Sequence, residues 1–124
     1  MLVNVGSSLC HLDGYPRIAL LDAQGQVLPF TYRQGGDQEV TSNPPDVVNL
    51  PPGAAGYVLT NKYRCDAGNK ATALSMQVTP PGNTSGLSMP LSEGSRPAFC
   101  GAGDPGSTLA ISPVEPNARA TFAF

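Results

Sequence analysis

The stretch Ala71–Leu91 (ATALSMQVT PPGNTSG LSMPL) decides the fold, because it places two apolar segments on either side of a turn rich in proline and glycine. Ala71–Thr79 and Leu87–Leu91 are the two predicted strands. One register gives three apolar cross-strand pairs: Val78 with Leu87, Met76 with Met89, and Leu74 with Leu91. Such pairs specify register, since a slip by one residue would turn all six side chains toward water. The stretch therefore predicts an antiparallel β-hairpin.

Cys65 and Cys100 flank this hairpin and continue its register outward. The register therefore predicts that the two residues form a disulfide. Structural disulfides persist mainly in oxidising compartments, which favours an extracytoplasmic location, either secreted or anchored to the cell envelope. The chain has 3 cysteines, an odd number, so Cys10 is left over and is predicted to be a free thiol in a loop.

The rest of the chain also favours strands, because no window has helical apolar spacing without an interrupting Gly or Pro. The predicted strands are Leu2–Val5, Arg17–Asp22, Val27–Arg33, Asp46–Leu50, Gly56–Asn61, Ala71–Thr79, Leu87–Leu91, Thr108–Ser112 and Arg119–Phe124. Many short strands separated by turns are typical of an all-β, immunoglobulin-like two-sheet sandwich. We expect residues 1–124 to form one such domain.

Composition excludes some classes of partner. Charged residues make up 13% of the chain, about half the ~25% of average soluble proteins. The seven basic residues are scattered and the net charge is −2, so there is no basic patch for nucleic acid or an anionic membrane. No stretch approaches the ~20 apolar residues that a transmembrane helix needs.

The beginning of the chain resembles the interior of a strand, since Met1 is followed at once by Leu2–Val5. We expect a targeting sequence and a first strand to precede this segment. A missing strand would leave a sheet edge open, and open edges are normally covered. Arg119–Phe124 (RATFAF) is the predicted filler, either folded back on its own chain or exchanged with a second chain in a homodimer.

Several short motifs occur in a characteristic order along the chain. They are Asn4–Gly6, Cys10–Pro16, Leu50–Ala55, Val78–Gly82, Cys100 and Ile111–Val114. Together they resemble an actinobacterial family of exported domains of unknown function, common in mycobacterial and streptomycete lipoproteins and secreted proteins. The Cys-x-Leu-x-Gly-Tyr-Pro motif is the most specific part of the resemblance, which covers nearly the whole chain. The resemblance implies export and brings no known catalytic or ligand residues.

No pattern in the sequence indicates an active site. Cys10 and His11 are adjacent, but neighbours in an extended segment point to opposite faces, which argues against a thiol–imidazole pair. A zinc site made of the three cysteines and His11 would lack the close Cys spacing of structural zinc sites. The nine carboxylates lie at strand ends or in loops, where they are typical turn residues. We expect no metal and no cofactor.

Tyr63 and Arg64 are the predicted exposed partner contacts, because tyrosine and arginine are enriched at binding hot spots. The sequence thus favours a non-enzymatic cell-envelope module that binds or scaffolds a protein, glycan or lipid of the envelope. The alternative is a hydrolase or redox enzyme whose site is assembled across loops. Converging carboxylates, or a converging Cys10 and His11, would favour the enzyme, whereas an exposed apolar patch or groove would favour binding.

Overall fold

The computed structural model describes residues 1–124 as an all-β chain with two single-turn 3-10 helices. The strands are β1 (Leu2–Val3), β2 (Cys10–Asp13), β3 (Arg17–Leu21), β4 (Thr31–Gln34), β5 (Val47–Leu50), β6 (Ala55–Gly56), β7 (Thr60–Lys62), β8 (Ala71–Thr72), β9 (Ser75–Thr79), β10 (Leu87–Pro90), β11 (Ala98–Phe99) and β12 (Thr108–Ile111). The helices are η1 (Pro105–Ser107) and η2 (Arg119–Thr121). Neither is long and apolar enough to cross a membrane.

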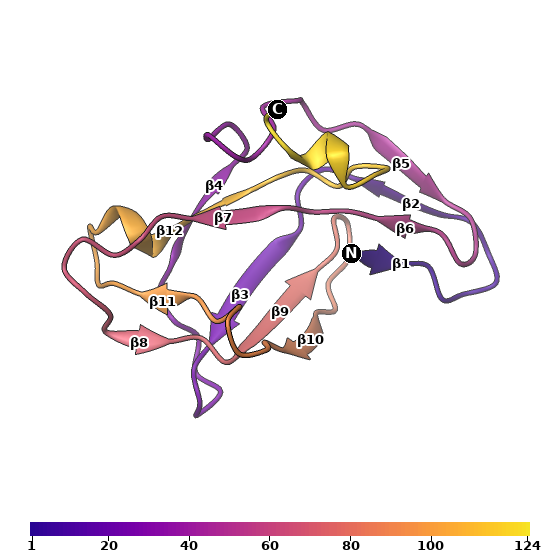
Figure 1. Ribbon diagram of the computed structural model, residues 1–124. Coiled ribbons are helices and arrows are strands. Elements are labelled where there is room, and N and C mark those ends of the chain that lie inside the picture. The colour runs from indigo at the N-terminus through magenta and orange to yellow at the C-terminus, as the bar shows by residue number, and fades with distance from the viewer.

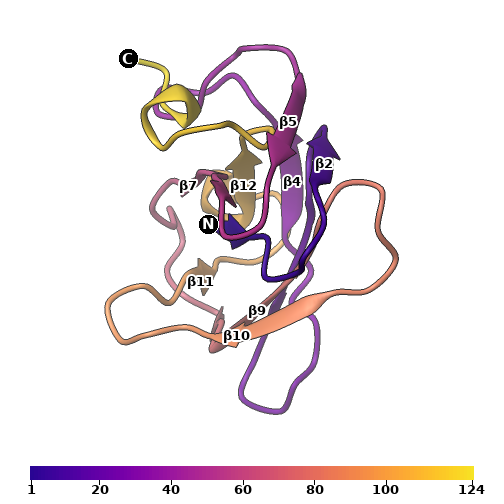
Figure 2. The same cartoon turned by 90° about the vertical axis from the view of Figure 1, so that its right-hand side faces the viewer.

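The strands form five small sheets, with orders β1-β6, β10-β9-β3, β11-β8, β4-β12-β7 and β2-β5. All pairings are antiparallel except that of β12 with β4. Figure 1 shows β1, β2, β5 and β6 gathered at one end of the molecule and β8 and β11 at the other. In both views β1 lies above the β9–β10 hairpin, and Figure 2 shows the loop of that hairpin rising beside β2.

The β9–β10 hairpin has the predicted register. Val78 pairs with Leu87 and Met76 with Met89. The long predicted strand Ala71–Thr79 is divided, however, because its backbone changes partners: the Ala73 N–H donates to the Pro97 carbonyl at 2.9 Å, and the Leu74 N–H to the Leu21 carbonyl at 2.8 Å. The chain thus leaves β11 and joins β3 at this point.

Two apolar clusters make up most of the core. The larger contains Ile18, Leu20, Leu28, Phe30, Ala73, Val78, Leu109 and Ile111. The smaller contains Leu12, Val48, Leu50 and Val114. Leu20 is fully buried, so the β3–β9 sheet contributes the centre of the larger cluster. The smaller cluster lies beneath β2 and β5, and partly buried Leu2 of β1 packs against both clusters.

The loop predicted around Cys10 is wrong, because Cys10–Asp13 forms β2 and pairs with β5 along its length. Only one of its residues, Leu12, is buried, and it packs against Val48 and Leu50. A strand with a single buried apolar residue gives almost no alternating pattern in the sequence. Long-range pairing with β5 therefore determines this strand.

The predicted C-terminal strand is also wrong. Arg119–Thr121 forms η2, and the following Phe122 bridges to Val40 rather than to β1. Side chains stabilise this turn: Asn117 Oδ1 accepts the Ala120 N–H at 2.9 Å, and Thr121 Oγ1 donates to the Ala118 carbonyl at 2.6 Å. The tail therefore packs on its own chain, and it leaves the edge of β1 open.

Candidate binding site

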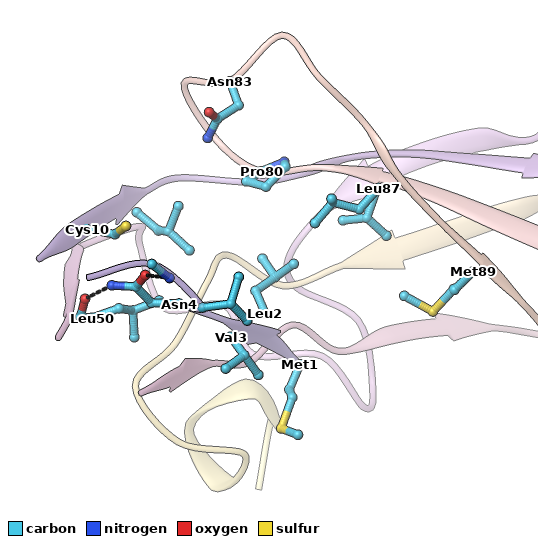
Figure 3. A pocket seen from close by; sticks show the side chains of 14 residues that line it. Met1, Leu2, Val3, Asn4, Cys10, Leu50, Pro80, Asn83, Leu87 and Met89 are labelled. Atoms are coloured by element: carbon cyan, nitrogen blue, oxygen red, sulfur yellow. Dashed lines mark hydrogen bonds between the residues drawn. The ribbon is translucent and has the colours of Figure 1, made fainter. Parts of the chain in front are cut away.

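An apolar groove of about 420 Å³ lies between β1 and the β9–β10 hairpin (Figure 3). One wall consists of Met1–Gly6, together with Cys10, Leu12 and Leu50. The other wall consists of Val78, Pro80, Asn83, Leu87 and Met89. Ten of these 14 residues are hydrophobic and none carries a charged side chain. The groove is therefore suited to an uncharged, apolar ligand.

Asn4 holds the first wall in place. It is 7% exposed, and its side-chain amide donates to the carbonyls of Ser8 and Leu50, each at 2.7 Å. Its Oδ1 accepts the Gly6 N–H at 2.9 Å, which closes the turn after β1. A buried amide with all these bonds fixes the backbone strongly, because a broken bond would leave a buried polar group unpaired. Asn4 is therefore a structural residue of the groove and is not free to bind a ligand.

The second wall exposes much of its apolar surface. Leu87 and Met89 lie on the same face of the hairpin as Val78, which is buried in the larger core cluster. Yet Leu87 is 56% exposed and Met89 is 41% exposed. The outer part of this face is therefore uncovered. Sequence reasoning predicted the register of these residues but not their exposure.

Cys10 lies on the rim of the groove as an exposed cysteine outside the disulfide. Its neighbour His11 has its Nδ1 hydrogen-bonded to Asn49 Oδ1 on β5. Successive side chains of a strand point to opposite faces, so the thiol and the imidazole do not converge. The structure therefore shows no thiol–imidazole arrangement at this position.

The position of Cys10 gives a direct chemical prediction. Titration of the native protein with an aromatic disulfide reagent should find one reactive thiol per chain, because the other two sulfurs are bonded to each other. Cys10→Ser should abolish the reaction and leave the fold intact, since the Cys10 side chain is exposed. Reaction at Cys65 or Cys100 under native conditions would overturn this assignment.

Cys65 and Cys100 form a disulfide with a Cα–Cα distance of 5.3 Å, and Cys100 directly follows β11. The Lys62 ammonium lies 4.0 Å from Cys65 Sγ and 3.8 Å from Cys100 Sγ. Burial lowers the pKa of Lys62, and the charge of Asp104 opposes that shift. A buried disulfide is typical of a protein that folds in an oxidising environment.

Asp104 organises the loops beside this disulfide. Its carboxylate accepts the backbone N–H groups of Gly106 at 2.9 Å and of Ala67 and Asp66 at 3.0 Å. These bonds, with that from Gly106 the largest contribution, lower the pKa of Asp104. Asp104 also caps η1. The predicted role of Asp104 as a turn residue thus corresponds to a specific contact between two loops.

Tyr63 and Arg64, the predicted partner contacts, lie beside the disulfide and are exposed, Tyr63 by 45%. Neither contributes to the groove. The predicted partner contacts therefore lie apart from the apolar groove. No sequence pattern predicted the groove, because its walls come from segments that are far apart in the chain, such as those of Leu2 and Leu87.

One pair of carboxylates interacts. Burial raises the pKa of Glu115, and the negative charge of Asp46 raises it further. Neither residue lines the groove. No group of three or more His, Cys, Asp or Glu side chains is arranged to hold a metal ion.

The structure thus defines an all-β domain with an internal disulfide and an apolar groove that no charged side chain lines. Comparison with known protein families matches residues 1–115 to the family described as a domain of unknown function, DUF4232. The match covers most of the chain, and the protein therefore belongs to this family. We found no match among curated proteins and none among solved structures.

Proposed function

We propose that this domain is a non-enzymatic, extracytoplasmic binding module of the cell envelope and that the apolar groove beside β1 is its binding site. The observation that carries the proposal is the uncovered apolar surface of Leu87 and Met89 within a groove that lacks charged side chains. Exposed apolar surface of this kind is costly in water and marks interaction sites. We also propose that the protein is exported from an actinobacterial cell and that its layers have an immunoglobulin-like arrangement. The disulfide supports export, and the family resemblance supports both parts.

The chemistry of the groove narrows the class of ligand. Glycan recognition relies on several polar side chains that orient hydroxyl groups. The groove has two amide side chains, and that of Asn4 is already bonded within the protein, which leaves only Asn83 for this role. An anionic lipid headgroup would need a basic residue, and none lines the groove. The best-suited ligand is an apolar segment of a protein or an uncharged hydrocarbon chain.

A neutral environment-sensitive dye tests whether the groove binds apolar molecules. Nile red should gain fluorescence on binding, and Leu87→Lys should weaken its affinity at least about tenfold, because a leucine contact is lost and a charge is placed in an apolar site. Val47→Lys is the matched control, since Val47 is also a strand residue, is 50% exposed and lies outside the groove. Equal affinity for the two variants would refute the groove as the binding site.

A further inference from the structure

We propose, independently of the apolar groove, that a second site binds the carboxylate or phosphate of an acidic sugar. This site is a polar slot of about 420 Å³ between β7 and the loop 91–97, which joins β10 to β11. Its lining includes Lys62 and Arg96 and no carboxylate. The slot and the groove share no residue, so the two sites are separate.

Lys62 occupies a position that normally carries an apolar residue. It lies directly opposite Leu109 of β12, so the two side chains share one face of the sheet, and Leu109 belongs to the larger core cluster. A charge on the core face of a strand is normally paired. The Lys62 ammonium has three N–H groups and donates one of them to the Tyr63 carbonyl at 2.7 Å. It therefore has donors left but no counter-ion within the slot.

The neighbouring carboxylates are bonded elsewhere. The charge of Asp104 acts on Lys62, but the oxygens of Asp104 accept three backbone N–H groups of the adjoining loops. Asp37 accepts the side-chain amide of Asn61 at 2.9 Å. Neither carboxylate lines the slot, and Glu93 of the loop does not line it either. The slot therefore offers its positive charge to an anion from solvent.

Arg96 is oriented by contacts within its own loop. Its Nε donates to the Leu91 carbonyl at 3.1 Å, which leaves the four N–H groups of the two terminal nitrogens available. These groups bind a carboxylate or phosphate in bidentate geometry. The loop turns just before Arg96, where the Ser95 N–H donates to the Ser92 carbonyl at 2.9 Å and Gly94 has a φ of +88°. A hydrogen-bonded turn thus places the arginine at the slot.

The backbone of β7 adds further polar groups to the slot. β7 is the edge strand of its sheet and pairs only with β12. The Ser112 N–H donates to the Leu59 carbonyl at 2.9 Å, and alternation along the strand directs the backbone of Asn61 toward β12 as well. The N–H and C=O groups of Thr60 and Lys62 therefore point away from β12, on the side of the slot that these residues line. The N–H groups can bind an oxyanion, and the carbonyls can accept hydroxyl groups beside it.

The rest of the lining favours a polar molecule as the carrier of the anion. Leu109 is the one hydrophobic residue of the eight that line the slot, and it is buried. Thr60 and Ser95 contribute hydroxyl-bearing side chains beside the two cations. A carboxylate or phosphate group alone would leave most of the slot empty, so there is room for the hydroxyl groups of a sugar. Two basic residues are too few for a nucleic acid or an anionic membrane, which need several.

Titration with three related sugars tests the site. Glucuronate, glucose 6-phosphate and uncharged glucose are added to the native protein at low ionic strength, and ¹⁵N NMR spectra follow the amides of Thr60, Lys62 and Ser95. We expect at least one of the two acidic sugars to shift these amides in a saturable manner and glucose to leave them unchanged. The acidic sugar that binds more tightly identifies the anion as a carboxylate or as a phosphate.

Charge-matched variants separate the slot from general electrostatic attraction. Arg96→Met should weaken binding of the tighter sugar at least about tenfold, because a charge-assisted bidentate contact is lost. Arg17→Met is the control, since it removes the same charge from an exposed arginine outside the slot, and it should change the affinity less than about twofold. Lys62→Met should also weaken binding about tenfold, with exposed Lys70→Met as its control. Arg96 is exposed, so its variant remains decisive even if Lys62→Met disturbs the nearby disulfide.

Three results would overturn the inference. If glucose shifts the same amides as strongly as the acidic sugars, the anion does not carry the binding. If Arg17→Met weakens binding as much as Arg96→Met, the attraction is not specific to the slot. If neither acidic sugar shifts the amides of the slot, it is no acidic-sugar site. Nile red binding to the same variants is a separate readout, because it depends on Leu87 and not on Arg96, so the groove and the slot are refuted or supported independently.

Discussion

The double substitution Cys65→Ala/Cys100→Ala should lower the free energy of unfolding by about 3 to 4 kcal/mol. The disulfide closes a loop with a sequence separation of 35 residues, and in the chain-entropy view a loop of this length restricts the unfolded ensemble by about that amount. For a domain of this size the loss corresponds to a fall in melting temperature of roughly 15 °C. Urea and thermal denaturation monitored by far-UV circular dichroism measure both quantities.

Alanine is the suitable replacement because Cys100 is only 2% exposed, and a serine hydroxyl would add a buried polar group that needs a hydrogen-bond partner. Cys10→Ser is the control, since it removes an exposed thiol outside the disulfide and should change stability by less than about 0.5 kcal/mol. A loss below about 1 kcal/mol in the double variant would mean that the loops around the disulfide are held by other contacts. In that case the Asp104 hydrogen bonds would be the dominant constraint.

The β9–β10 hairpin could be predicted from sequence because its information is local. Three apolar pairs and a Pro-Pro-Gly turn lie within about twenty residues, and only one register satisfies them. The same register also predicted the disulfide, but in the structure this register does not continue as far as the two cysteines. Beyond the hairpin, β8 pairs with β11 in a shifted register, Phe99 opposite Ala71, because the loop between β10 and β11 adds residues.

The strand, the pairings and the strand bounds that sequence reasoning missed depend on partners far away in the chain. β2 is defined by pairing with β5, and the parallel pairing of β12 with β4 joins Thr108 to Thr31. The predicted strand Val27–Arg33 is reduced to β4 and an isolated bridge at Val27, and the predicted strand Gly56–Asn61 is divided between β6 and β7. Local apolar pattern does not specify where such strands begin and end.

The groove could not be predicted because exposure depends on what covers a residue. Leu87 and Met89 have the same pattern as the buried Val78, and only the extent of the opposing layer distinguishes them. The predicted pairing of RATFAF with a sheet edge near Leu2–Val5 does not occur within the chain. RATFAF has the alternation of a strand, but Asn117 and Thr121 stabilise a 3-10 turn there instead.

Gly106→Ala should destabilise the fold by about 2 to 3 kcal/mol, through a clash at the place where η1 packs against the disulfide. A Cβ atom at Gly106 would lie 2.7 Å from the Arg64 carbonyl oxygen and 2.7 Å from Cys100 Sγ. Neither atom can move easily, since one belongs to the backbone and the other to a disulfide. Overpacking of a close contact typically costs about 1 to 3 kcal/mol, and urea denaturation should find a loss in the upper part of that range.

Gly94→Ala separates this clash from ordinary backbone strain. Gly94 has a φ of +88° and a Cβ atom added there would meet no atom within 4 Å, so alanine should cost only the conformational penalty of about 1 kcal/mol. Gly106 has no positive φ, and its cost comes from the close approach of Arg64 and Cys100 alone.

The clash also predicts an interaction between sites: in the Cys65→Ala/Cys100→Ala background the sulfur is absent, so Gly106→Ala should cost less than in the native protein. If Gly106→Ala lowers the free energy of unfolding equally in both backgrounds, the clash is with the Arg64 backbone alone. If in the native protein it costs no more than Gly94→Ala, the loops move to accommodate the added Cβ atom and the clash is refuted.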